Sequence, residues 1–113
     1  MRTPAILLSF ALLSACVQPA PKPTPAPEAI AARDAAARAV VRCGLQYAPQ
    51  IDDGMSDAAT VALALAIRCQ PEYGAMIDAY GKDLDNDAQR EMFRDRAGTR
   101  EKRIERFLPL VMQ

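Results

Sequence analysis

Three aspartates spaced two apart are the most conspicuous candidates for chemistry in this chain. Asp83, Asp85 and Asp87 match the spacing of the first three oxygen ligands in a twelve-residue calcium-binding loop. Such a loop also requires glycine at its sixth position and glutamate at its twelfth, where this chain has Ala88 and Arg94. We therefore predict no metal site and no cofactor. If the chain does bind calcium, these three aspartates are the candidate ligands.

The same segment has the residues that begin a helix. Asn86 can accept a hydrogen bond as an N-cap, and Gln89 lies three residues later, as in a capping box. Asp87 favours the positive end of a helix dipole. These features predict a helix start here in preference to a metal loop.

Few residues in the chain are suited to nucleophilic or acid–base catalysis. There is no histidine, and Ser56 and Asp57 precede an apolar run, where we expect one of the two to cap a helix. Asp52 and Asp53 supply paired carboxylates of the kind that cleave glycans, but a turn rich in aspartate is usually a solvated turn. We therefore expect no enzyme, and an enzyme acting on peptidoglycan is the least favoured alternative.

The N-terminus has the organisation of a secretory signal peptide. A positive charge at Arg2 precedes an apolar run, residues 5–12, that is too short to span a bilayer. The next four residues, Leu13-Ser14-Ala15-Cys16, resemble the lipobox of bacterial lipoproteins. The resemblance covers only the N-terminus. It implies removal of residues 1–15 by signal peptidase II, a diacylglycerol on the Cys16 thiol, and a further acyl group such as palmitate on the new amino group.

The residues after Cys16 predict where the protein is sorted and how it is tethered. Val17 replaces the aspartate that retains enteric lipoproteins in the inner membrane, so the resemblance implies a lipid anchor in the outer membrane, facing the periplasm. Prolines alternate with other residues up to Pro27 and favour an extended spacer. Residues 16–27 would hold a domain about 30 Å from the membrane, with a proline-rich ligand for a partner domain as the alternative.

The two remaining cysteines, Cys43 and Cys69, predict a disulfide. An even pair in an exported protein is typical of a disulfide framework. Two thiolates without histidine fall short of the four ligands of a structural zinc site, and there is no Cys-x-x-Cys spacing for a redox pair.

The hydrophobic pattern of residues 28–113 predicts an all-α domain, a small three- or four-helix bundle joined by that disulfide. We expect helices over 28–48, 57–69, 71–83 and 87–107, with Pro49 and Pro109 ending the first and last. The second is apolar almost all round and is expected in the middle of the bundle. Arg100 falls within the apolar stripe of the last helix, with its stem over the core and its guanidinium in water, or else paired with an acid.

The basic C-terminal segment is the candidate surface for a partner. Arg96, Arg100 and Lys102 belong to a stretch in which six bases are interspersed with three acids, so a solvated helix face is the simpler interpretation. The export signal excludes nucleic acid as a partner. We expect a membrane-anchored, non-catalytic interaction or accessory module with an envelope protein as partner. The alternative is an envelope protein that binds calcium or a small ligand.

Overall fold

The computed structural model describes residues 24–113, and the predicted signal peptide, Cys16 and most of the linker lie outside them. Within this part of the chain there are five helices and no strand, which confirms the predicted all-α fold. Their order along the chain is α1 (Pro27–Ile51), α2 (Ala58–Arg68), α3 (Gln70–Gly81), α4 (Asp87–Ala97) and α5 (Arg100–Val111).

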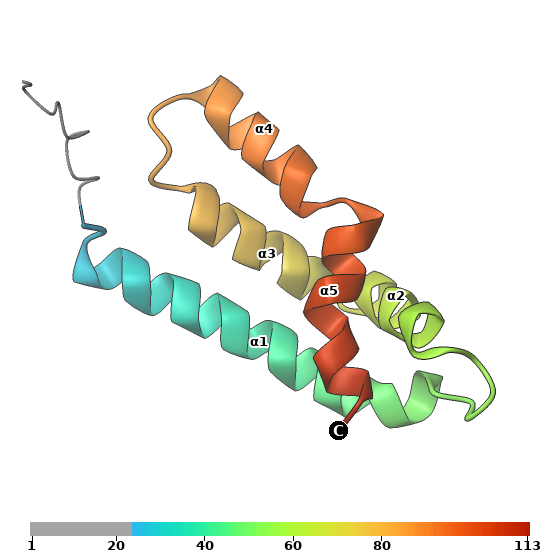
Figure 1. Cartoon of the computed structure of the whole chain (residues 1–113). Helices are drawn as coiled ribbons and strands as arrows, with labels where there is room; N and C mark the ends of the chain where they lie inside the picture. The colour runs from blue at the N-terminus through green and yellow to red at the C-terminus, as the bar shows by residue number, and fades with distance from the viewer. Residues whose placement is uncertain (1–23) are drawn as a thin grey trace, which may run out of the picture.

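The helices form a layer of three, with the other two packed at one end. In Figure 1, α3 lies between the long α1 and α4, and α5 crosses beside α2 at the opposite end from the loop that joins α3 to α4. The predicted disulfide is present between Cys43 of α1 and Cys69, the residue between α2 and α3, with their Cα atoms 5.9 Å apart. It joins the layer to the α2–α3 corner.

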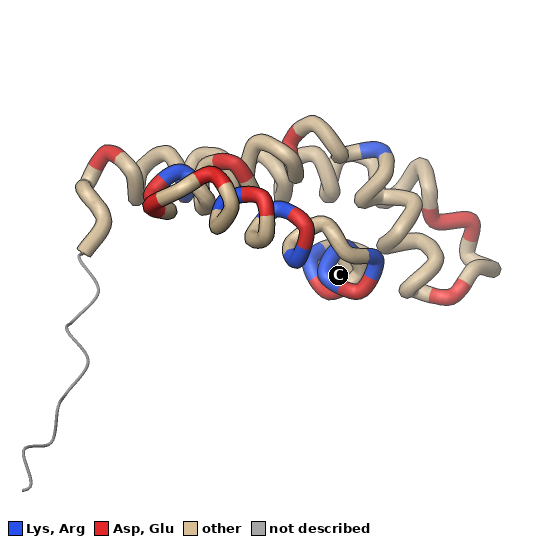
Figure 2. Tube along the Cα trace, turned by 90° about the horizontal axis from the view of Figure 1, so that it is seen from above, with Lys and Arg blue, Asp and Glu red and all other residues tan. Residues whose placement is uncertain are grey.

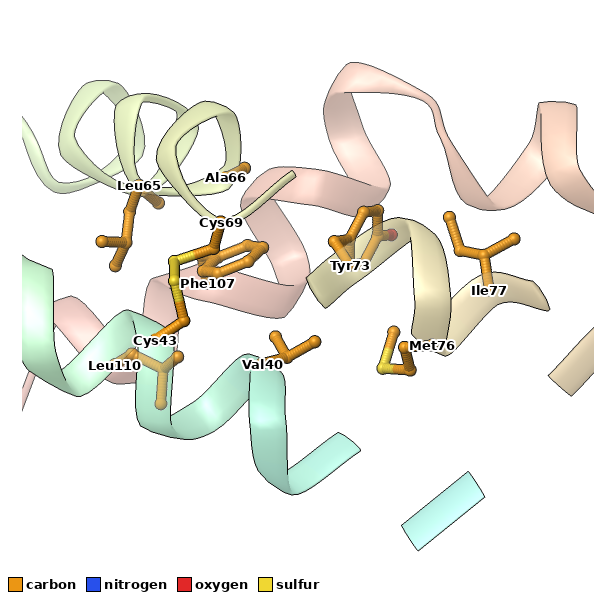
Figure 3. Packing of buried hydrophobic residues seen from close by; sticks show 11 residues of the cluster. Val40, Cys43, Leu65, Ala66, Cys69, Tyr73, Met76, Ile77, Phe107 and Leu110 are labelled. Carbon is orange, nitrogen blue, oxygen red and sulfur yellow. A yellow bond between two sulfur atoms is a disulfide. The ribbon is translucent and has the colours of Figure 1, made fainter. Parts of the chain in front are cut away.

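The core gathers around this disulfide. Phe107 and Leu65 are fully buried in the same cluster as the two cysteines, and Figure 3 shows side chains from α1, α2, α3 and α5 converging there. The rings of Tyr73 and Phe107 meet edge to face with centroids 5.8 Å apart. Such a pair stabilises the fold by about 0.5–1.5 kcal/mol beyond its burial.

The two predicted helix caps are present. Asp57 accepts a hydrogen bond from the Thr60 backbone N–H, and Asn86 accepts one from the Gln89 N–H, each at 2.9 Å. Each cap satisfies a backbone donor that has no partner within its helix. These contacts fix where α2 and α4 begin.

The number of helices exceeds the predicted three or four, because the last predicted helix, 87–107, is two. Gly98 ends α4, and Thr99 caps α5 by accepting a hydrogen bond from the Lys102 N–H at 3.3 Å. A glycine followed by threonine weakens helix continuation and favours a new start. The break frees α5 to turn across α2.

Neither proline ends its helix, contrary to the prediction. α1 continues past Pro49 to Ile51, and α5 continues past Pro109 to Val111. Both prolines lie in the last turn, so each removes one backbone hydrogen bond but has little helix after it to disrupt. Ile51 and Val111 pack against the core. Burial of these end residues offsets the local preference against helix before proline.

The prediction that α2 lies in the middle of the bundle is also wrong. Val61, Ala62, Leu65 and Ala66 are buried, but Ile67 is 60% exposed on the opposite side of the helix. α2 packs mainly against α5 and also against α1 and α3, and the bundle is too small to surround it.

Candidate functional site

The three candidate calcium residues do not converge. Asp83 forms an ion pair with Arg33 of α1, Asp87 pairs with Arg90, and Asp85 is exposed. Among residues 24–113, the acidic and cysteine side chains whose ligand atoms cluster within 4.8 Å are those of Cys43, Cys69 and Glu72. The two cysteines are already bonded to each other, so this group supplies one free ligand.

The acidic turn before α2 uses its carboxylates to hold its own backbone. Asp53 accepts hydrogen bonds from the N–H groups of Met55 and Ser56 and from the Ser56 hydroxyl, at 2.7 to 3.0 Å. These bonds lower the pKa of Asp53, with the Ser56 N–H contributing most. The pKa of Asp57 is lowered in the same way, first by the Thr60 N–H and then by the Thr60 hydroxyl. Both carboxylates and Ser56 therefore act as turn and cap residues.

Two ion pairs join acidic residues in and just after α3 to arginines of the neighbouring helices α1 and α4. The Arg94 Nε and Nη2 atoms donate to the same Asp78 oxygen at 3.1 and 2.9 Å, which joins α4 to α3. Arg33 pairs with Asp83 and lies 5.4 Å from the Tyr80 ring centroid, which joins α1 to the end of α3. Opposite charges from the middle of the chain and from its basic C-terminal segment thus meet at Asp78 and Arg94.

Three basic residues lie at the exposed corner where α4 meets α5. We define this α4–α5 corner by Arg96, Arg100 and Lys102, all of which are exposed. Figure 2 shows α5 nearly end-on behind the C mark, with blue Lys and Arg positions and red acidic positions on the same helix. Lys102 pairs with Glu105 at 2.9 Å, which raises the pKa of its amino group. Within residues 24–113, Arg96 and Arg100 form no ion pair, and the alternative of a partly buried pair for Arg100 is not seen.

A depression of about 330 Å³ lies beside this corner, and Gln70, Tyr73, Arg94 and Arg103 contribute to its lining. The Tyr73 hydroxyl donates to the carbonyl of Ala97 at 2.5 Å, and burial raises the pKa of this phenol while Arg103 opposes that shift. The Nε atom of Arg103 is buried and has no hydrogen-bond partner in the described part of the protein. The depression is therefore lined by two arginines, the acid Asp95 and the Tyr73 ring.

Arg33, Asp78 and Arg103 were not anticipated as parts of any site. Arg33 and Asp83 are fifty residues apart in the sequence, and no local spacing indicates such a pair. The interspersed charges of the C-terminal segment give no sign of which arginine remains unpaired.

No protein-family model, curated protein sequence or solved structure matches this chain. Within residues 24–113, no helix combines the length and the hydrophobicity that a membrane crossing needs.

Proposed function

We propose that this protein is a lipid-anchored lipoprotein of the bacterial envelope whose helical domain is a non-catalytic interaction module. The observation that carries the proposal is the Leu13-Ser14-Ala15-Cys16 sequence, followed by a proline-rich strip that ends where α1 begins. An acylated Cys16 would hold the protein at the outer membrane, and the strip would present the domain to the periplasm.

The α4–α5 corner is the proposed contact surface for an envelope protein partner. Arg96 and Arg100 are exposed and form no ion pair among the described residues, so pairing them with an outside carboxylate breaks no existing ion pair. Arginine is favoured at interfaces because its planar guanidinium forms two parallel hydrogen bonds with a carboxylate. An acidic protein surface is therefore the partner chemistry that this corner fits.

The candidate catalytic groups are already engaged in hydrogen bonds that hold the turn before α2, and this supports a non-catalytic role. Ser56 donates to Asp53 from its hydroxyl and its backbone N–H, and Asp57 accepts from the Thr60 N–H at the start of α2. No unengaged acid and base face each other in that turn.

Photo-crosslinking in intact cells tests the contact surface. Probes replace Arg96 or Lys102 in the full chain, and a matched control probe replaces the exposed Glu28 on α1. A recurrent protein adduct from the corner but not from Glu28 supports the proposal. Adducts with lipid alone, or equal adducts from all three positions, would refute a partner at this corner.

The lipid anchor is tested separately with the variant Cys16→Ala. The expected result is loss of fatty-acid labelling and release of the chain from the membrane fraction. Unchanged labelling and fractionation would show that the N-terminal resemblance is misleading. Turnover of a purified envelope substrate by the intact protein would remove the non-catalytic assignment.

A further inference from the structure

The outward side of α2 is an apolar surface that the rest of the described chain leaves partly uncovered. The ten residues 58–67 carry no charge. We define the outer face of α2 by the residues that recur at helical spacing opposite its buried side: Ala59, Thr60, Leu63, Ala64 and Ile67. Ile67 is 60% exposed, and Leu63 and Ala64 are half-buried.

The one polar residue of this face is already satisfied. The Thr60 hydroxyl donates to the Asp57 carboxylate at 2.9 Å, so this donor needs no water partner. A helix at the surface of a small domain normally places charged and polar residues outward, and one that is apolar all round is normally covered. The outer face therefore has the composition of a contact surface.

Charges occur only at the two ends of α2. Asp57 caps the N-terminus, and Arg68 is the last residue of the helix, about 16 Å away at 1.5 Å per residue. Asp57, Ala64 and Arg68 are separated by seven and then four residues, so they follow one line along the flank of the outer face. The Arg68 guanidinium is held at this rim because it lies 4.2 Å from the Tyr47 ring centroid.

This arrangement complements itself, and from it we infer that the outer face of α2 binds the same face of a second copy of the chain. When two α2 helices pack antiparallel about a twofold axis, Asp57 of each copy lies beside Arg68 of the other on the same flank. The helix dipoles then also oppose each other favourably. A parallel arrangement about a twofold axis would place both aspartates at one end and both arginines at the other, on opposite flanks. Only the antiparallel arrangement brings Asp57 of one copy beside Arg68 of the other.

The same charges disfavour a lipid surface as the occupant of this face. Asp52, Asp53 and Asp57 are all exposed at the N-terminal end of α2, where anionic headgroups would repel them. Helices that lie on membranes carry basic residues around their apolar face, whereas α2 offers Arg68 alone within its own length.

The predicted contact is weak and reversible. One side of an eleven-residue helix offers much less than the roughly 800 Å² per partner of a stable interface. The anchoring proposed above would confine the copies to one membrane surface and raise their effective concentration. In this respect the strength of pairing in the cell rests on the proposed function, whereas the geometry of the contact does not.

The test is photo-crosslinking of the full chain in its membrane, with the probe at Ile67 and a control probe at the exposed Ala75 of α3. The expected adduct from Ile67 has twice the mass of the chain, and mass spectrometry finds this sequence on both sides of the link. The control gives no such product. No adduct from Ile67, or one with lipid or a different protein, would overturn the self-contact.

Charge reversal provides the second measurement. With the probe at Ile67, Arg68→Glu should reduce the adduct at least about fivefold, because two carboxylates then face each other at each end. Arg42→Glu makes the same charge change on an exposed part of α1 and should leave the yield unchanged. Equal yields in both variants would refute the antiparallel pairing. The circular dichroism spectrum verifies that each variant is folded.

Failure of the proposed anchoring is distinguishable from failure of this contact. If the chain is not membrane-bound in cell fractionation, the self-adduct should still form in concentrated solution. If the chain is membrane-bound but Ile67 gives no self-adduct, the anchoring stands and the self-contact is refuted.

Discussion

Removal of the Cys43–Cys69 disulfide should be the most damaging single covalent change to this domain. The two cysteines are 26 residues apart, and closing a loop of that length lowers the entropy of the unfolded chain. The chain-entropy relation gives about 3.5 kcal/mol of stabilisation at 25 °C. Since small domains are stable by about 5–15 kcal/mol in total, this is a large share.

The assay compares three forms of the domain by urea unfolding and thermal melting at 222 nm: oxidised, reduced, and the double variant Cys43→Ala/Cys69→Ala. Reduction should lower the melting temperature by about 14–28 °C, from about 4–8 °C per kcal/mol for a domain of this size. The alanine variant should lose roughly 1 kcal/mol more for each buried sulfur removed, because the cysteines are 7% and 0% exposed.

The reduced wild type is the informative control, since it retains both sulfur atoms and lacks only the bond. A difference of less than about 1 kcal/mol between oxidised and reduced forms would contradict the reasoning. It would mean that the unfolded chain is already restricted over this loop, so that the cross-link removes little entropy.

Three further predictions follow from single contacts. Gly44→Ala should destabilise the domain by about 1–3 kcal/mol in urea unfolding, because the added methyl group meets Leu110. The control Gly74→Ala meets nothing within 4 Å and should be neutral or stabilising, and equal effects of the two variants would contradict the close approach of α1 and α5. Tyr73→Phe should cost about 1 kcal/mol and speed hydrogen exchange at the end of α4, because the bond from its hydroxyl to a carbonyl there is lost; unchanged exchange would count against that bond. The pKa of Asp57 is lowered in the folded state, so its contribution to stability is complete above the unfolded pKa of about 3.9 and is lost as the pH falls through the lower folded value. Asp57→Asn should therefore flatten the decline in melting temperature below about pH 4, and a decline identical to that of the wild type would exclude this role.

Much of the local structure was predictable because its causes lie within a few residues. Asp57 and Asn86 cap helices through N–H groups three positions away, and this spacing is visible in the sequence. The disulfide could be inferred because Cys43 and Cys69 form an even pair once Cys16 is assigned to a lipid, and that assignment itself stays a prediction. The candidate calcium spacing was visible too, but spacing alone does not show which partners take up each carboxylate.

The errors all concern elements whose local preference competes with long-range contacts. Pro49 and Pro109 favour ending a helix, but burial of the last turn against the core carries each helix further. The break at Gly98 is set by a weak helix former and by the position of α5 across α2.

The sequence by itself determined that residues 28–113 are helical, where α2 and α4 begin, and which cysteines are joined, since propensity, capping and cysteine parity act locally or by count. Only the tertiary structure decided that Arg33 neutralises Asp83, that Arg94 binds Asp78, and that one apolar side of α2 faces outward. These features depend on which surfaces meet when five short helices share one small core. That choice arises from the combined burial of all of them and from no single segment.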